Sequence, residues 1–365
     1  MLFDVAPKDE RTSLFGRDKE LEKLLQSFGS KAPLILLLGM RRVGKTSLLK
    51  VALKEWGQPY LYLDLRALAD GGFSKVVFYR LLSDELTRVQ SSWDRLRFFL
   101  QKVRGVQVAG ISVELDWRRN GMTISSLFRK IDEWLESEGK NMAVAFDEAQ
   151  LLRDMRGGKG RIDFRKFLAY CYDNLRHVKF VLTGSEVGLL MDFIGAEDPS
   201  SPLYGRYREE IVLQKFDRET SLEFLRRGFR EHGFEPSPDV LEKVVDVLDG
   251  VVGWLTYYGY TAVYEKKFDE NILEKVVDQA KRVTENELSK VFQRSRYYKH
   301  VLRAVGMGYG EWAAIKRAAE AWSGVPISNA HLTRLLHGLE KLSIIEKKDG
   351  KYVFTDPIVA KIVGP

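Results

Sequence analysis

The chain has 365 residues, of which 45% are hydrophobic and 30% charged, so we expect two or three domains with proper cores. Its formal net charge of +7 favours a polyanionic partner, although ordinary surface charge produces the same balance. The single cysteine, Cys171, excludes an intrachain disulfide and a thiolate metal site. The start has no signal-peptide pattern and no apolar run approaches the ~18 residues of a membrane span, so we expect a cytoplasmic protein without a membrane partner.

The first half of the chain alternates helical and strand patterns. Residues 16–29 place their leucines on one helical face, and similar patterns predict helices over 46–56, up to about 102, and over 124–137. Buried strands are predicted at 34–38, 143–146 and 179–184, and the alternating residues 60–66 predict a further strand. This alternation predicts an α/β fold with a parallel sheet that binds ligands at the carboxyl ends of its strands. Residues 106–117 alternate differently and predict an inserted β-hairpin.

The second half is mainly helical. After residue 216 the strand pattern stops, and we predict a phosphate-loop domain over 1–216 followed by a helical lid over 217–285. Residues 286–365 then follow a helix, turn, helix and hairpin pattern, with Asp349-Gly350 as the hairpin turn.

The segment GMRRVGKT, from Gly39 to Thr46, fits the phosphate-loop pattern G-x-x-x-x-G-K-[ST] between a predicted strand and a predicted helix. Its backbone N–H groups form an anion nest, while Lys45 reaches the β- and γ-phosphates and Thr46 ligates Mg²⁺. We therefore expect ATP or ADP, with Mg²⁺, to be bound by Gly39, Met40, Arg41, Arg42, Val43, Gly44, Lys45, Thr46 and Ser47.

Two adjacent arginines, Arg41 and Arg42, occupy the middle of this loop. Because the backbone, Lys45 and Thr46 already explain phosphate binding, we expect both side chains to point away from the phosphate cradle. Our hypothesis is that they pair with acidic groups of the lid or the C-terminal domain and so sense whether the site is closed.

Paired carboxylates end the predicted strand at 143–146. Asp147, at the strand tip, is placed to hold Mg²⁺, and Glu148 to orient and deprotonate an attacking water. A surface Asp-Glu pair that opens a helix is the alternative, since the helix dipole favours acidic residues there. The preceding phosphate loop favours the metal-and-base interpretation.

Two further segments carry candidate polar groups. Thr183 and Ser185 end another buried strand and are expected beside the γ-phosphate and the attacking water, with capping of the next helix as the alternative. Arg206 lies in a loop rich in Gly, Pro and Ser, where an arginine acting in its own chain or on a neighbour stabilises transition-state charge. A surface arginine without a catalytic role is the competing interpretation.

Together, FGRDKEL, GMRRVGKTSLL, AFDEAQ, VLTGSE, SPLYGR and YVFTDPIVAKI resemble a largely archaeal family of P-loop ATPases of the AAA+-like STAND branch. The resemblance covers essentially the whole chain. It implies a central phosphate-loop strand, a helical lid, a C-terminal winged helix, and Phe15, Gly16 and Arg17 near the adenine or ribose. From the residues alone, Arg17 could equally be a solvated residue opening a helix. The Gly-x-Pro element of related lids has no proline here, so Gly253 and Trp254 could simply be lid core.

The C-terminal segment is basic, with 13 Lys or Arg and 8 Asp or Glu over 285–365. In its second helix we expect the leucines inward and Asn329, His331, Arg334 and Lys341 outward. A recognition helix with a basic wing suits double-stranded DNA, and such folds also dock protein partners.

Three functions are considered for the whole chain. The first is a nucleotide-dependent switch that hydrolyses ATP slowly with Glu148, Lys45 and Arg206 and couples lid closure to the winged helix. The alternative is a DNA-binding protein, resembling replication initiators, in which ATP only sets the conformation. A scaffold that contacts protein partners through the hairpin is a third.

Overall fold

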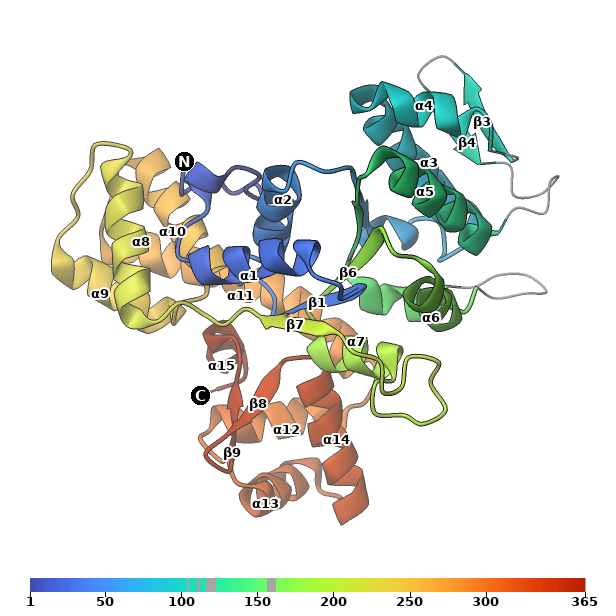
Figure 1. The fold of residues 1–365 in the computed structure, drawn as a ribbon. Helices are drawn as coiled ribbons and strands as arrows, with labels where there is room; N and C mark the ends of the chain where they lie inside the picture. The colour runs from blue at the N-terminus through green and yellow to red at the C-terminus, as the bar shows by residue number, and fades with distance from the viewer. Residues whose placement is uncertain (104, 110–111, 116–122, 156–161, 365) are drawn as a thin grey trace.

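The computed structural model describes residues 1–365 except 104, 110–111, 116–122, 156–161 and 365 (Figure 1). A parallel sheet lies in the middle of the molecule, the helical lid on one side of it, and the C-terminal domain below. Separate hydrophobic clusters form the lid core and the C-terminal core, and two more cover the opposite faces of the sheet. None of the helices in the described ranges is long and apolar enough to span a bilayer.

The central sheet confirms the predicted α/β class. Its five strands are β2 (Tyr60–Asp64), β5 (Met142–Asp147), β6 (Val178–Gly184), β1 (Leu34–Leu38) and β7 (Glu209–Val212), all parallel and in that order. Every residue of β1 is buried, which explains its unbroken apolar run. The family resemblance implied a central phosphate-loop strand. In the structure β6 occupies the centre and β1 lies between β6 and the edge strand β7.

Helices cover both faces of the sheet. Leucines and a phenylalanine of α1 (Asp18–Gly29) and α2 (Lys45–Glu55) pack on one face. The other face is covered by α3 (Lys75–Ser92), α4 (Asp94–Leu100), α5 (Ile124–Glu138), α6 (Phe164–Asn174) and α7 (Val187–Ile194). Short 3₁₀ helices are η1 (Arg11–Ser13), η2 (Leu65–Leu68) and η3 (Ala149–Asp154).

The predicted inserted hairpin is present as β3 (Val106–Ala109) and β4 (Ser112–Leu115), which pair antiparallel. Its turn at 110–111 and its end at 116–117 lie outside the described residues. The backbone N–H of Val113 donates to Thr87 Oγ1 at 2.9 Å, so β4 packs on α3.

The lid comprises α8 (Arg218–Arg230), α9 (Pro238–Leu248), α10 (Val252–Glu265) and the first part of α11 (Glu270–Phe292). Helix α11 continues through residue 285, where we placed the end of the lid. Its residues up to Ala280 pack in the lid core, whereas Leu288 and Val291 pack in the C-terminal core. Helix α11 therefore joins the two units.

The C-terminal domain has α12 (Tyr297–Gly306), α13 (Trp312–Ser323), α14 (Asn329–Lys341), β8 (Ile345–Lys348), β9 (Lys351–Phe354) and α15 (Pro357–Val363). Asp349 and Gly350 both have positive φ and form the tight turn of the wing. Our expectation that Lys341 faces outward is wrong, because its Nζ lies 2.6 Å from Asp192 on α7. The end of α14 therefore packs on the sheet domain.

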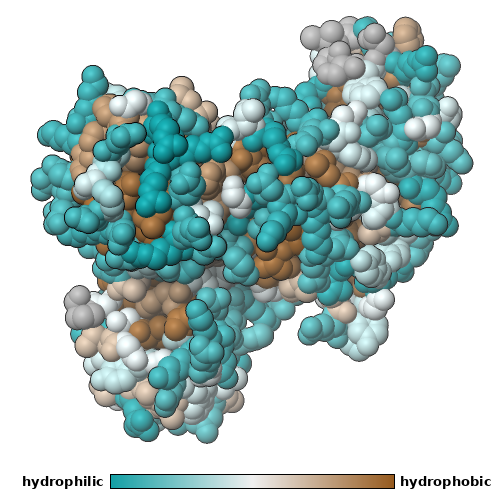
Figure 2. All heavy atoms as spheres, turned by 60° about the vertical axis from the view of Figure 1, so that its left-hand side comes forward, coloured by the Kyte–Doolittle hydropathy of each residue, from teal (hydrophilic) through white to brown (hydrophobic). Residues whose placement is uncertain are grey.

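The surface view in Figure 2 shows hydrophilic side chains over most of this face, with hydrophobic residues concentrated where the lobes meet. Helix α15 illustrates such a seam: Ile358 belongs to the lid core and Val359 to the C-terminal core. The lid and the C-terminal domain are thus packed together, and both lie against the end of the sheet that carries the phosphate loop.

Candidate functional site

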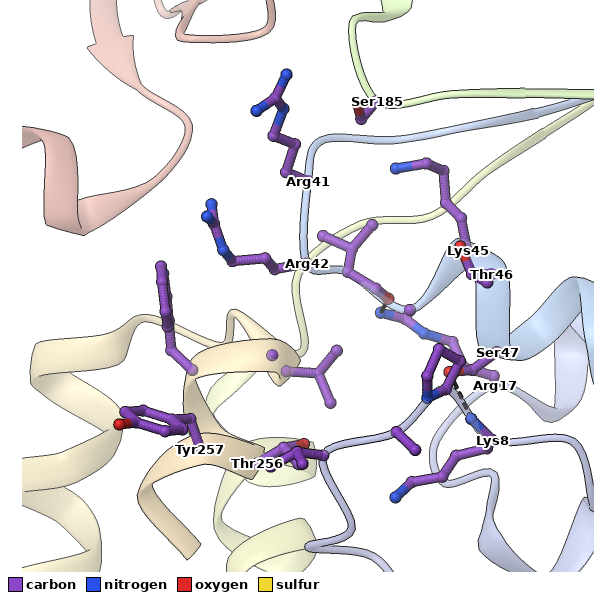
Figure 3. A pocket seen from close by; sticks show the side chains of 18 of the residues that line it. Lys8, Arg17, Arg41, Arg42, Lys45, Thr46, Ser47, Ser185, Thr256 and Tyr257 are labelled. Atoms are coloured by element: carbon purple, nitrogen blue, oxygen red, sulfur yellow. Dashed lines mark hydrogen bonds between the residues drawn. The ribbon is translucent and has the colours of Figure 1, made fainter. Parts of the chain in front are cut away.

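A cavity of about 780 Å³ opens where the carboxyl edge of the sheet, the lid and the N-terminal residues meet (Figure 3). Its lining includes the loop from Arg41 to Ser47, together with Glu148 and Ser185 from the next two strands of the sheet. The other wall comes from residue 2, residues 4–8 and α10. Loop, carboxylate and hydroxyl groups that are distant in the sequence therefore share one site.

The loop 39–46 has the conformation that an anion nest requires. Gly39 and Gly44 have φ of 145° and 95°. A Cβ on Gly39 would lie 2.6 Å from the carbonyl oxygen of Leu213, so a side chain does not fit there. Helix α2 starts at Lys45, and its free backbone N–H groups face the cradle.

Lys45 lies folded over this loop. Its Nζ donates to the carbonyl oxygens of Gly39 and Met40, each at 2.7 Å. Burial lowers the pKa of Lys45 to about 8, although the charges of Glu148 and Asp147 oppose that shift. The ammonium group is therefore desolvated and close to the cradle, where a phosphate would replace carbonyl oxygens as its partner.

Asp147 at the end of β5 is fully enclosed. Its Oδ2 accepts hydrogen bonds from Thr46 Oγ1 at 2.9 Å and from the Tyr62 hydroxyl at 2.6 Å, and its Oδ1 accepts one from Thr183. Asp147 and Thr46 thus place a carboxylate and a hydroxyl oxygen side by side, a donor set that suits Mg²⁺. Thr183 lies behind Asp147 and does not line the cavity.

Glu148 faces the cavity. Its Oε2 accepts from Ser185 Oγ at 2.8 Å, from the Ser185 backbone N–H at 3.2 Å and from Gln150 Nε2 at 2.5 Å. Burial raises the pKa of Glu148, but the charge of Lys45 and these hydrogen bonds outweigh burial and the net shift is downward. The carboxylate is therefore ionised at neutral pH and held in one orientation. Thr183 accepts a bond from the Glu148 backbone N–H at 3.1 Å.

Arg41 and Arg42 point away from the cradle (Figure 3), and acidic groups of other elements hold them. Arg41 lies 3.1 Å from Glu186 and 3.2 Å from Glu287 on α11. Arg42 lies 2.7 Å from Glu287 and 3.7 Å from Asp356, the N-cap of α15. The expected pairing with acidic groups beyond the sheet domain is confirmed for both arginines.

Arg42 also contacts the lid directly. Its guanidinium carbon lies 4.3 Å from the centre of the Trp254 ring, and Trp254 Nε1 donates to Asp356 at 3.0 Å. The backbone N–H of Gly253 donates to the carbonyl oxygen of Arg42 at 2.9 Å. Gly253 and Trp254 are thus more than lid core, because they join the phosphate loop to the C-terminal domain.

The segment from Phe15 to Arg17 lies beside the loop. Phe15 and Arg17 line the cavity, whereas Gly16 packs against Phe216 and does not. Arg17 is 5% exposed, which excludes a solvated residue. Its Nη2 donates to the carbonyl oxygens of Val43 at 3.0 Å and Gln214 at 2.6 Å, so Arg17 fixes the loop from behind.

Arg206 does not line the cavity. Its Nη1 pairs with Asp173 at the end of α6, its Nε donates to the carbonyl oxygen of Pro202 at 2.9 Å, and its guanidinium lies 5.1 Å from the Tyr172 ring centre. The side chain is therefore engaged away from the site in its own chain.

Several residues of the site were not predicted. The alternation of β2 places Tyr62 on the face of Tyr60 and Asp64, and recognising the β2–β5 pairing would have brought it near Asp147. Gln150 lies two residues from Glu148 and could have been tested as its partner. No local sequence pattern indicates that residues 2–8 and Lys290 lie at the site, because their neighbours there are distant in the sequence.

This fold and this loop define a P-loop nucleotide-binding protein with a lid and a C-terminal winged helix. Residues 14–258 match a family described as an ATPase domain predominantly from Archaea, and residues 292–354 match the C-terminal winged helix-turn-helix domain of MCM proteins. The chain belongs to this family of archaeal ATPases. A search of curated proteins finds no match.

Solved structures agree with this assignment. The Walker-type ATPase PABY2304 of Pyrococcus abyssi is 35% identical, with a TM-score of 0.85 and coverage of 100% of this chain and 99% of that one. The ORC2 protein of Aeropyrum pernix, in ADPNP-ADP complexes, is 16% identical with a TM-score of 0.62, covering 99% and 95%. The ADP form of the same protein is 15% identical with a TM-score of 0.55, and the match covers 99% of this chain and 97% of that one. The A. pernix structures share the fold.

Proposed function

We propose that the protein is an ATP-dependent switch that binds ATP with Mg²⁺ and hydrolyses it slowly to ADP and phosphate. The observation that carries this proposal is the contact of Thr46 Oγ1 with Asp147 Oδ2 at 2.9 Å, with the Glu148 carboxylate in the cavity that Thr46 also lines. The working units are an ATPase domain over 1–216, a lid over 217–285 and a winged helix over 286–365.

Each group of the site has a distinct role. Lys45 and the N–H groups of the loop neutralise and orient the phosphates, and Thr46 and Asp147 hold Mg²⁺, which supplies further charge neutralisation when bound. Glu148, ionised and fixed by Ser185 and Gln150, accepts a proton from the attacking water. The apolar end of the cavity, which includes Phe15 and Phe216, receives the base.

The switch is coupled through the two loop arginines. Arg42 contacts Trp254 of the lid, Glu287 of α11 and Asp356 of the winged helix, so a shift of the loop alters contacts to all three. Arg42 itself has a φ of 66°, an uncommon conformation for a residue with a side chain. The contacts to Trp254, Glu287 and Asp356 hold the Arg42 backbone in this conformation. The loop could therefore adopt a second backbone arrangement when these contacts are lost.

A pair of variants tests the assignment. Lys45→Ala removes the buried ammonium group, and we expect calorimetric ATP affinity to fall by about a hundredfold or more. Glu148→Gln keeps the size of the side chain, so it should retain ATP binding while steady-state phosphate release falls by about 10²-fold or more. If ATP binding is unchanged in Lys45→Ala, the assignment fails.

DNA binding is a second candidate function. The wing exposes Lys347, Lys348 and Lys351, which suits contact with a phosphate backbone. The end of α14 packs on α7, so full insertion of that helix into a groove would need the domain to move. Duplex binding at several salt concentrations, with and without ATP, tests this function, and absence of binding at low salt removes it.

A further inference from the structure

Residues 2–8, which we call the strap, cross the mouth of the cavity with an anchor at each end. The backbone N–H of Leu2 donates to Glu231 Oε2, at the end of lid helix α8, at 2.7 Å. The backbone N–H of Lys8 donates to Ser47 Oγ, in the first turn of α2, at 3.1 Å (Figure 3). The strap therefore links the lid to the helix that follows the phosphate loop.

The lid anchor is a socket for the ring of Phe3. Gly228 on α8 and Gly259 on α10 flank this ring, and a Cβ on either would lie 2.3 Å from a ring atom. The ring is 2% exposed and packs edge to face with Phe224 and Phe229. Glycine destabilises a helix interior relative to alanine, so two glycines facing one ring indicate a site shaped for that ring.

Between its anchors the strap forms one wall of the cavity. Asp4, Val5, Ala6, Pro7 and Lys8 line it opposite the lid residues Val252, Thr256 and Tyr257. A nucleotide held by the loop would have its base at this end, between strap and lid. The two anchors, on Glu231 and on Ser47, hold the strap beside that end of the cavity.

We propose that the strap gates nucleotide exchange, with Phe3 as the positioning residue that keeps the gate closed. The inference rests on the proposed nucleotide site, and it adds a control of exchange to that site. The gate acts on the rate of nucleotide release. Hydrolysis of bound ATP depends on Glu148 and the loop, none of which contacts Phe3.

The test measures release of a fluorescent ADP analogue from the full chain by stopped flow. We expect Phe3→Ala to release it about tenfold faster, because the lid anchor loses its buried ring. Gly228→Ala should accelerate release similarly, because its methyl group occupies the place of the ring. Phe3→Leu should release the analogue at a rate between those of the wild-type chain and Phe3→Ala. Gly29→Ala at the end of α1, where a Cβ meets nothing within 4 Å, is the matched control.

A second pair leaves the lid core intact and so separates gating from loss of folding. Glu231→Ala removes the acceptor for Leu2 and should speed release by about threefold. Glu235→Ala, another exposed glutamate in the segment that follows α8, should release at the wild-type rate. In all these variants the hydrolysis rate of bound ATP, measured in a single turnover, should stay at the wild-type value.

The outcomes separate the gate from the proposed function. If the wild-type chain binds the analogue and release is unchanged in both Phe3→Ala and Glu231→Ala, the gate is refuted and the nucleotide site stands. If the wild-type chain binds no nucleotide, both fail. A loss of single-turnover hydrolysis in Phe3→Ala would also overturn the gate, because it would indicate a general effect on the fold.

Discussion

The buried ammonium group of Lys45 makes nucleotide affinity depend on pH. Burial lowers its pKa to about 8 in the free protein, while phosphate oxygens would favour the charged form and raise it again. Above pH 8 the free protein therefore loses a proton that binding must restore. We expect ATP affinity to be flat with respect to this group below about pH 7 and to fall by up to about tenfold per pH unit above pH 8.

Calorimetry in buffers of different protonation enthalpy measures this uptake directly. A net proton should be taken up on binding at pH 9 and much less at pH 6.5. Lys45→Arg provides the control, since a guanidinium stays protonated over this range and should bind with no comparable slope. A dissociation constant that stays constant from pH 7 to 9.5 in the wild-type chain would contradict the role given to Lys45.

At the level of elements, the Arg42–Glu287 pair is expected to couple the phosphate loop to α11. The two side chains are only 19% and 32% exposed and make two hydrogen bonds, at 2.7 and 3.3 Å. We expect a double-mutant cycle of Arg42→Ala and Glu287→Ala to give a coupling energy of about 1 kcal/mol. Chemical unfolding followed by tryptophan fluorescence suits this measurement, because Trp254 stacks on Arg42.

The Arg95–Glu138 pair is a matched control for this cycle. It also joins two helices, at 2.8 Å, but the Arg95 side chain is 81% exposed. Solvent screening should leave its coupling energy well below that of the Arg42–Glu287 pair. Equal coupling in the two pairs would mean that the junction at Arg42 is an ordinary surface contact, and the proposed route from the loop to the winged helix would lose its support.

The elements also separate what the sequence could predict from what it could not. The loop, the strands and the Asp147–Glu148 pair were predictable because each depends on local patterns, and parallel strands bring their carboxyl ends together. The anchor of Leu2 on Glu231 joins residues 229 positions apart, and no local pattern reports such a contact. Lys341 was misplaced for the same reason, since helical periodicity identifies an outward face but not the domain that covers it.

At the scale of the whole molecule, the position of Arg206 bears on whether one chain hydrolyses ATP alone or needs a neighbouring chain. In its own chain it is held by Asp173, Tyr172 and the carbonyl oxygen of Pro202, and it does not line the cavity. We therefore expect Arg206→Ala to hydrolyse ATP at the wild-type rate per chain when the protein is dilute. A phosphate-release assay at low protein concentration measures this rate.

The same assay over a range of protein concentrations tests action on a second copy. If Arg206 completes the site of a neighbouring chain, the wild-type rate per chain rises with concentration while that of Arg206→Ala stays flat. Arg208→Ala is the matched control, because Arg208 lies in the same loop and pairs with Glu210 at 2.7 Å. A large loss of activity in dilute Arg206→Ala, with Arg208→Ala unaffected, would contradict the placement: the loop would then have to leave Asp173 and reach the γ-phosphate within one chain.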